Sequence, residues 1–286
     1  MNNKICIITG ATSGIGKATA FKLADLGASL VLLSRNQEKG EKICYQIRKR
    51  INNAQVKFYR ADLSSMKKVR SAVEKIKSDF THIDVLINNA GARFDKYYKN
   101  DEGIELTFAT NHLGHFLLTL SLIEELRKST QGRIINVSSS AHKGITQKLD
   151  DIVNPVNFNK EETYARSKLA NLYFTYELSR HLKNSTVTVN AVDPGFVSTN
   201  FARNNGLIPW IKFNTYYLLK RKLISPQKAT ETIVYLASSE EVSEITGKYF
   251  LDKKEINSSP YSYNSETASI LWQLSLNLTE AEDLQI

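Results

Sequence analysis

Short apolar runs alternate along the chain with longer segments of helical periodicity. Continuous runs of β-branched residues and leucine are typical of strands that are buried on both faces of a sheet. Strands and helices in regular alternation predict a parallel sheet joined by right-handed crossovers. We therefore expect an α/β fold of three layers, doubly wound around a mostly or wholly parallel seven-stranded sheet. The expected strands are Lys4–Thr9, Ser29–Ser34, Gln55–Arg60, Ile83–Asn88, Arg133–Ser138, Thr186–Val192 and Lys248–Leu251.

The chain shows no linker, repeat or low-complexity tract between these segments. We expect one catalytic domain over residues 1–255 and a C-terminal extension, 256–286, packed on the same domain. Two stretches interrupt the alternation, at 141–163 and 199–222. Loops of this length inside a compact domain are usually functional or disordered.

Composition excludes several classes of protein. The hydrophobic fraction of 42% and the charged fraction of 23% are ordinary for a globular protein and argue against disorder. The net charge is +9, from 38 Lys and Arg against 29 Asp and Glu. The basic residues are scattered, and the densest clusters, Arg48–Arg50 and Lys220–Lys222, form no clear nucleic-acid motif. We expect no nucleic-acid partner.

The sequence also bears on location. Two cysteines, Cys6 and Cys44, cannot form a disulfide framework. No apolar run approaches the roughly 18 residues of a spanning helix, and the run Ile5–Ile8 is too short for a signal peptide. We expect a cytoplasmic protein. Peripheral attachment to a membrane surface stays open as a less favoured alternative.

A glycine-rich turn, Thr9–Gly16, follows the first expected strand and opens the first expected helix. Glycine allows a sharp turn and a close approach of backbone N–H groups to a ligand. A helix N-terminus attracts phosphate groups. The spacing of Gly10, Gly14 and Gly16 is G-x-x-x-G-x-G, which differs from the commonest dinucleotide fingerprint. Its place between strand and helix nevertheless predicts a pyrophosphate site.

The end of the second expected strand bears on the choice of cofactor. An acidic residue there would bind the ribose 2′-hydroxyl of NAD, whereas an arginine suits the 2′-phosphate of NADP. The strand ends in Leu33-Ser34-Arg35, and no acidic residue occupies 34–36. This favours NADP(H) over NAD(H). The alternative is that Arg35 is a solvated surface residue.

Further motifs follow in a fixed order along the chain. With the glycine turn, they make the sequence resemble the short-chain dehydrogenases/reductases over roughly residues 3–255. Lys168–Asn171, Gly247–Phe250 and the long Ser-to-Tyr spacing are similar to the retinol-dehydrogenase-like branch of that family. The motifs are Asp62-Leu63, Asn88-Asn89-Ala90-Gly91, Asn111, Ser138-Ser139, Tyr164-Ala165-Arg166-Ser167-Lys168 and Asp193-Pro194-Gly195.

The resemblance implies a Rossmann fold, an NADP(H)-dependent reaction and a set of site residues. The implied catalytic residues are Asn111, Ser139, Tyr164 and Lys168, with Ser138 as the alternative serine. The implied cofactor-binding residues are Gly10, Ser13, Gly14, Ile15, Gly16, Arg35, Asp62, Leu63, Asn88, Ala90, Gly91, Tyr164, Lys168, Pro194, Gly195, Val197 and Thr199.

Tyr164 and Lys168 are four residues apart, so they share one face of a helix. A free tyrosine hydroxyl has a pKa of about 10, too high for proton transfer near neutrality. Lowering it to about 7 requires roughly 4 kcal/mol. One ammonium at about 4 Å supplies this at an effective dielectric near 20. Lys168 is therefore sufficient to activate Tyr164.

The remaining polar residues receive supporting roles from the resemblance. Ser139 would hold the substrate oxygen, and Asn111 would fix a water that connects Lys168 to solvent. The five histidines lack the spacing of a metal site, so no metal is expected. His142 follows the serine closely and could line the substrate pocket.

The segment 196–222 is rich in Phe, Trp, Tyr and Leu. In the family that it resembles, this segment covers the substrate, so an apolar lid implies a lipophilic carbonyl or alcohol substrate, retinal/retinol-like or another aldehyde or ketone. The alternative from another class is a non-catalytic dinucleotide sensor or scaffold on the same fold. Monomer and homodimer both remain open.

Overall fold

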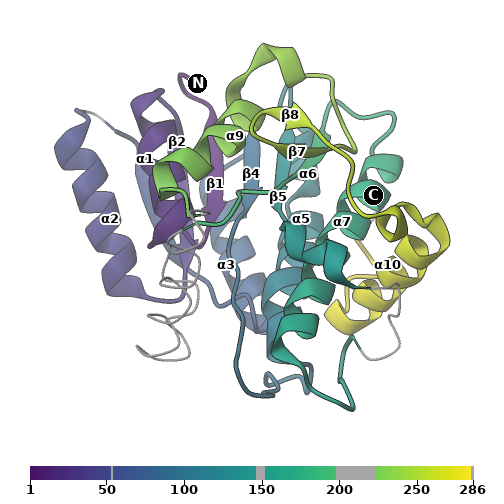
Figure 1. Ribbon diagram of the computed structural model, residues 1–286. Coiled ribbons are helices and arrows are strands. Elements are labelled where there is room, and N and C mark those ends of the chain that lie inside the picture. Colours follow the sequence, from purple (N-terminus) through teal and green to yellow (C-terminus); the bar gives the residue numbers. More distant parts are fainter. Residues whose placement is uncertain (53, 146–151, 198–222, 285–286) are drawn as a thin grey trace.

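The computed structural model describes residues 1–52, 54–145, 152–197 and 223–284. Eight strands form one sheet in the order β3-β2-β1-β4-β5-β6-β7-β8. Figure 1 shows α2 at one side of the molecule and α10 at the other. The strands are β1 Ile5–Thr9, β2 Ser29–Ser34, β3 Val56–Arg60, β4 Val85–Asn88, β5 Arg133–Val137, β6 Thr188–Val192, β7 Tyr249–Leu251 and β8 Lys254–Glu255. The helices are α1 Gly14–Asp25, α2 Gln37–Arg50, α3 Met66–Asp79, α4 Leu106–Phe108, α5 Gly114–Ser121, α6 Ile123–Arg127, α7 Lys160–His181, α9 Pro226–Ser238 and α10 Ser265–Thr279.

The predicted α/β architecture is confirmed. All seven expected strands form, and their observed ends lie within two residues of the expected ones. They pair in parallel from β3 to β7. An eighth strand, β8, was not predicted and pairs antiparallel with β7. The turn between them, Asp252-Lys253, has two positive φ angles, but it lacks the Asn-Gly or Asp-Gly pair that predicts such a hairpin.

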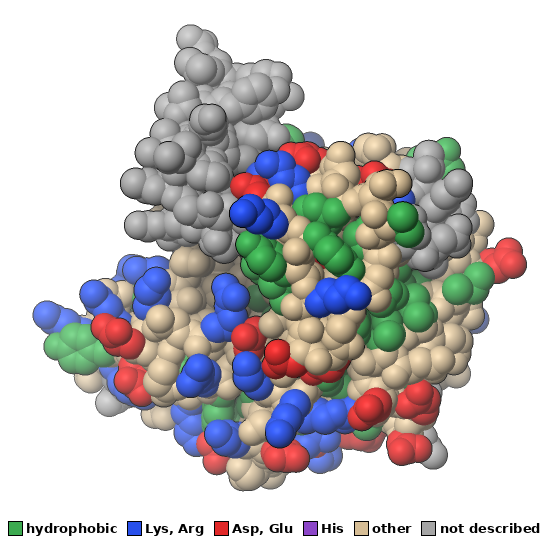
Figure 2. All heavy atoms as spheres, turned by 90° about the horizontal axis from the view of Figure 1, so that it is seen from below, with side chains coloured by type: hydrophobic (Ala, Val, Ile, Leu, Met, Phe, Trp, Pro, Cys, Tyr) green, Lys and Arg blue, Asp and Glu red, His purple; other side chains and the backbone are tan. Residues whose placement is uncertain are grey.

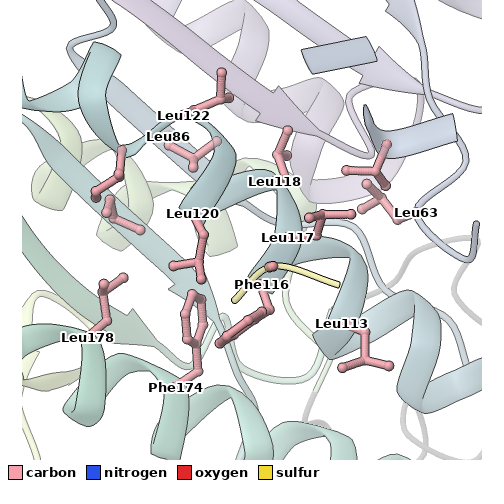
Figure 3. Close-up of a cluster of buried hydrophobic side chains, with 14 of the residues drawn as sticks. Leu63, Leu86, Leu113, Phe116, Leu117, Leu118, Leu120, Leu122, Phe174 and Leu178 are labelled. Carbon is pink, nitrogen blue, oxygen red and sulfur yellow. The ribbon is translucent and has the colours of Figure 1, made fainter. Parts of the chain in front are cut away.

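The core lies on both faces of the sheet because successive strand residues point to opposite sides. Cys6 and Ile8 pack with α1, α2 and α9, whereas Ile7 between them packs with α3, α5, α7 and α10. Helix α5 is buried along its whole length, as expected for a helix that is apolar on every side. Figure 3 shows Phe116 and Leu120 of this helix beside Phe174 of α7.

The basic residues that look scattered in the sequence are unevenly placed in the fold. Residues 35–77, from the end of β2 to α3, contain 13 Lys and Arg against 4 Asp and Glu. This excess of nine equals the net charge of the whole chain. In Figure 2, which looks from below onto the edge where the parallel strands end, Lys and Arg side chains gather on the side of α2.

None of the described helices combines the length and the apolar character needed to cross a membrane.

Gly114, the first residue of α5, is packed closely against the backbone of Leu63. A Cβ on Gly114 would lie 2.2 Å from the carbonyl oxygen of Leu63, a backbone atom that cannot swing away. We expect Gly114→Ala to lower the free energy of unfolding by about 1–3 kcal/mol, the usual cost of overpacking. Urea unfolding followed by circular dichroism measures it. Gly144→Ala is the control, because no described atom lies within 4 Å of the added Cβ. Equal unfolding midpoints for the two variants would contradict this packing.

Candidate active site

A cavity of about 1060 Å³ opens where the parallel strands end. Ligands of open α/β sheets bind at this edge, outside the carboxyl ends of the strands. The cavity brings together most of the predicted site residues from segments far apart in the sequence. Those that line it are Gly10, Ser13, Gly14, Ile15, Gly16, Arg35, Asp62, Leu63, Ala90, Gly91, Ser139, Tyr164, Lys168, Pro194, Gly195 and Val197.

The glycine turn is packed tightly against the end of β4. Gly10 has a φ of +67°, and a Cβ on it would lie 2.9 Å from the Cα of Ala90. A Cβ on Gly16 would lie 2.5 Å from both the Gly10 carbonyl oxygen and Asn89 Nδ2. Helix α1 then begins without a side-chain cap from Ser13 and without an acidic residue in its first turn. Its positive end therefore faces the cavity, as an anion site requires.

Thr9 connects this turn to two other parts of the site. Its Oγ1 accepts the N–H groups of Asn89 and Ala90, each at 2.9 Å, and lies 2.9 Å from His115 Nε2. His115 Nδ1 lies 3.0 Å from the Asn111 carbonyl oxygen, which can only accept. Nδ1 therefore carries the proton, and Nε2 accepts from the Thr9 hydroxyl. Burial lowers the pKa of His115 to about 3, so the ring is neutral.

Two cations lie at the end of the cavity formed by β2 and α2. Arg35 follows β2, and Lys39 lies in the first turn of α2, where its N–H is accepted by the capping side chain of Asn36. Neither cation forms an ion pair with a carboxylate of the described residues. Lys39 was not predicted as a site residue, although its position four residues after Arg35, at the start of an expected helix, was a usable signal.

Helix α7 places Tyr164 and Lys168 at the opposite part of the cavity. Asn159 caps the helix by accepting the N–H groups of Glu161 and Glu162. Lys168 is buried, and its Nζ donates to the Val137 carbonyl oxygen at 3.0 Å. The same Nζ lies 5.7 Å from the centre of the Tyr164 ring. Burial lowers the pKa of Lys168 to about 8, although the Asp193 carboxylate acts to raise it.

The two candidate serines have different surroundings. Ser138 is 1% exposed, and its Oγ donates to the Lys168 carbonyl oxygen at 2.9 Å. Its hydroxyl proton is thus engaged in fixing α7 to the end of β5. Ser139 Oγ accepts the N–H of Ala141 at 3.2 Å, and that bond leaves its own proton available. Ser139 is therefore the better placed of the two to donate to a ligand in the cavity.

Two predicted residues do not line the cavity. Asn111 is fully buried: its amide exchanges two hydrogen bonds with the Ala92 backbone and also donates to Ser167 Oγ. Asn88 donates to Thr119 Oγ1 and Asn136 Oδ1 inside the core. Both side chains therefore connect structural elements. Thr199, and the predicted lid beyond Val197, lie outside the described residues.

Some cavity residues were missed. Asn89 lines the cavity and donates from Nδ2 to the Thr9 carbonyl oxygen at 2.8 Å. Arg93 and Glu161 also line it, with 3.9 Å between Arg93 Nη1 and a Glu161 carboxylate oxygen. No sequence signal pointed to this pair, because its members belong to two segments that meet only in the fold.

No group of three or more His, Cys, Asp and Glu side chains gathers as a metal site in the part of the chain that the structure describes.

Comparison with known proteins agrees with this geometry. The family model for short chain dehydrogenase matches residues 4–207. Retinol dehydrogenase 13 of Homo sapiens is 39% identical, with 98% of this chain and 85% of that protein covered. Retinol dehydrogenase 14 of Homo sapiens is 36% identical, with 96% and 86% covered.

Solved structures share the architecture. An uncharacterised protein from Mycobacterium paratuberculosis superposes with a TM-score of 0.78 and 29% identity, over 98% of this chain and 94% of that chain. The NADPH-dependent reductase YwfH superposes with a TM-score of 0.70 and 26% identity, over 87% of this chain and 96% of that chain. The chain therefore belongs to the short-chain dehydrogenase/reductase family, in the branch of the retinol dehydrogenases, and is an oxidoreductase acting on the alcohol–carbonyl pair.

Proposed function

We propose that the protein is an NADP(H)-dependent oxidoreductase that interconverts a lipophilic carbonyl compound and its alcohol, with Tyr164 as the proton donor. The observation that carries this proposal is a single cavity lined both by the glycine turn and by Ser139, Tyr164 and Lys168. An anion site and an acid–base pair thus share one space, as a dinucleotide-dependent redox reaction requires.

The residues of the cavity fit a nicotinamide dinucleotide. The close packing of Gly10 and Gly16 brings the backbone and the uncapped end of α1 to the ligand, and such an end binds a pyrophosphate. When bound, the nicotinamide supplies or accepts the hydride. Pro194, Gly195 and Val197 line the cavity after β6, where they would hold the nicotinamide end.

The protein's own residues would position the substrate and transfer the proton. Ser139 Oγ donates to the substrate oxygen and holds it against the Tyr164 hydroxyl. During reduction Tyr164 gives its proton to that oxygen, and the Lys168 ammonium stabilises the resulting phenolate. We propose that a water near Asn111 reprotonates the pair. The Asn111 amide is already engaged, so its part in that path would be to hold Ala92 and Ser167 in place.

Preference for NADP(H) is supported by Arg35 and Lys39, which line the cavity without a carboxylate partner among the described residues. Two cations suit a 2′-phosphate, whereas an NAD site would offer a carboxylate to the ribose hydroxyls. YwfH, described as NADPH-dependent, adds support from the same fold.

A lipophilic substrate is supported by the relatives named retinol dehydrogenases, since retinol is a long apolar alcohol. Phe196 and Val197, the described residues of the predicted lid, line the cavity.

We also propose that residues 1–255 form the catalytic domain and that 256–286 are an extension of it. The contact of α10 with α7 through Phe174 and Trp272 supports this division. A cytoplasmic location, peripheral contact with a membrane, and the choice between monomer and homodimer stay predictions.

The proton donor is tested by Tyr164→Phe, which removes only a hydroxyl. We expect the rate of NADPH oxidation with all-trans-retinal or nonanal to fall by at least about a thousandfold. Phenylalanine has no proton to donate to the substrate oxygen and forms no phenolate that Lys168 could stabilise. The NADPH dissociation constant, from fluorescence titration, should stay within about twofold. Wild-type protein that binds NADPH but reduces no carbonyl compound would instead favour the sensor or scaffold alternative.

Cofactor preference is tested by Arg35→Ala and Lys39→Ala. We expect the NADPH dissociation constant to rise about a hundredfold and about tenfold respectively, because each variant loses a charge-assisted contact to phosphate. NADH binding should change little. Arg60→Ala is the matched control, since Arg60 ends the neighbouring strand β3, pairs in register with Ser34 and does not line the cavity. Wild-type protein that prefers NADH would refute the Arg35 argument.

The pH profile follows from the lowered pKa of Lys168. Reduction needs a charged Lys168 and a protonated Tyr164. As pH rises through about 8 the ammonium loses its proton, so kcat/KM for reduction should be level below this pH and fall above it, approaching tenfold per pH unit. A flat profile for reduction from pH 6 to 10 would contradict the role of Lys168.

A further inference from the structure

The segment Ser258–Tyr263 lies between β8 and α10 and has no part in the proposed chemistry. Its three serines are nevertheless buried: Ser258, Ser259 and Ser262 are each at most 6% exposed. Buried polar groups need partners, and several partners of this segment come from elements that carry the active site.

One partner is His142, in the turn directly after Ser139. The His142 side chain is fully buried and does not line the cavity, so the expectation that it lines the substrate pocket is wrong. The Ser259 N–H donates to His142 Nε2 at 3.0 Å, and His142 Nδ1 lies 2.5 Å from the Ser139 carbonyl oxygen. An N–H only donates and a carbonyl only accepts, so the ring is neutral with its proton on Nδ1. Burial lowers the pKa of His142, which favours this neutral form.

The other partners lie on α7, the helix that carries Tyr164 and Lys168. The Tyr176 hydroxyl lies 2.7 Å from Ser258 Oγ, and the Tyr173 hydroxyl donates to the Tyr261 carbonyl oxygen at 2.9 Å. The segment Ser258–Tyr263 is thus fixed on one side to the catalytic helix and on the other, through His142, to the backbone of Ser139.

A third contact extends from the His142 ring towards the loop after β6. The ring packs edge-on against Tyr249, with 5.4 Å between ring centres. The Tyr249 hydroxyl donates to Asp193 Oδ2 at 3.1 Å, and Asp193 Oδ1 accepts the N–H of Gly195, which lines the cavity. His142 therefore lies where the serine turn, the C-terminal segment and this loop meet.

We propose that His142 is a positioning residue that fixes the main chain of Ser139 against the segment Ser258–Tyr263, so that this segment sets the place of the Ser139 hydroxyl relative to Tyr164. The inference rests on the proposed function, in which these two hydroxyls act on one substrate oxygen. The nucleotide-binding residues at the ends of β1 and β2 are not among the contacts of the His142 side chain, which are Ser139, Ser259 and Tyr249.

The consequence is a selective effect on turnover. A misplacement of about 1 Å can cost about a hundredfold in rate. Loss of both His142 hydrogen bonds should therefore lower kcat for NADPH-driven reduction of all-trans-retinal about a hundredfold, while the NADPH dissociation constant stays within about twofold.

Three substitutions distinguish the contributions of the two hydrogen bonds of the His142 ring. His142→Phe keeps a ring and removes both hydrogen bonds. His142→Asn can keep a donor towards the Ser139 carbonyl oxygen, and His142→Gln can keep an acceptor for the Ser259 N–H. We expect kcat to fall about a hundredfold for His142→Phe and about tenfold for each amide variant. His82→Phe is the matched control. His82 lies in the loop before β4, at the amino-terminal ends of the strands and away from the cavity, so this variant should keep the wild-type kcat.

Folding is checked for every variant by thermal unfolding. A folded His142→Phe with wild-type kcat would overturn the inference, and so would a loss of NADPH affinity in parallel with kcat. If His142→Phe does not fold, a wild-type kcat in both amide variants would also overturn the inference. If the wild-type protein shows no turnover, both the proposed function and this inference are overturned. If the wild-type protein is active and the His142 variants have the same kcat, only the inference is overturned.

Discussion

The geometry of the site depends on the hydrogen bonds of the Thr9 hydroxyl. This hydroxyl stands at the point where β1 ends, accepts two backbone N–H groups from the end of β4, and donates to His115. His115 in turn holds the backbone of Asn111. The glycine turn, the end of β4 and the helical turn of Asn111 are therefore fixed relative to one another by one oxygen atom. A buried oxygen with every bonding direction used resists displacement, because any shift leaves a buried polar group unpaired.

The same principle explains how this fold uses its histidines. His115 and His142 are both buried, and each joins a donor on one side to a carbonyl oxygen on the other. A neutral imidazole is suited to this, since it carries one donor and one acceptor on a rigid ring. Burial lowers the pKa of both. They therefore act as fixed connectors near an active site whose proton chemistry is left to Tyr164 and Lys168.

The fold could be predicted from sequence because its strands are buried on both faces, so each appears as an unbroken apolar run. β8 could not, because its two residues carry no apolar signal and its turn lacks glycine. Among site residues, those on the glycine turn and on α7 were predictable, since local spacing alone puts them on one surface. The direction of a buried amide was not. Asn88 and Asn89 are adjacent, yet one points into the core and the other lines the cavity, and only tertiary packing decides between them.

The uneven distribution of charge has a consequence for the arrival of a ligand. Residues 35–77 carry an excess of nine positive charges, and the rest of the chain is balanced at 25 of each sign. The net positive charge is thus concentrated in one part of the fold, which includes the Arg35 and Lys39 end of the cavity. Its field reaches about one Debye length, ~8 Å at physiological ionic strength. Within that range a phosphorylated molecule is drawn in and turned before contact, so the rate of association would depend on salt more strongly than the rate of dissociation.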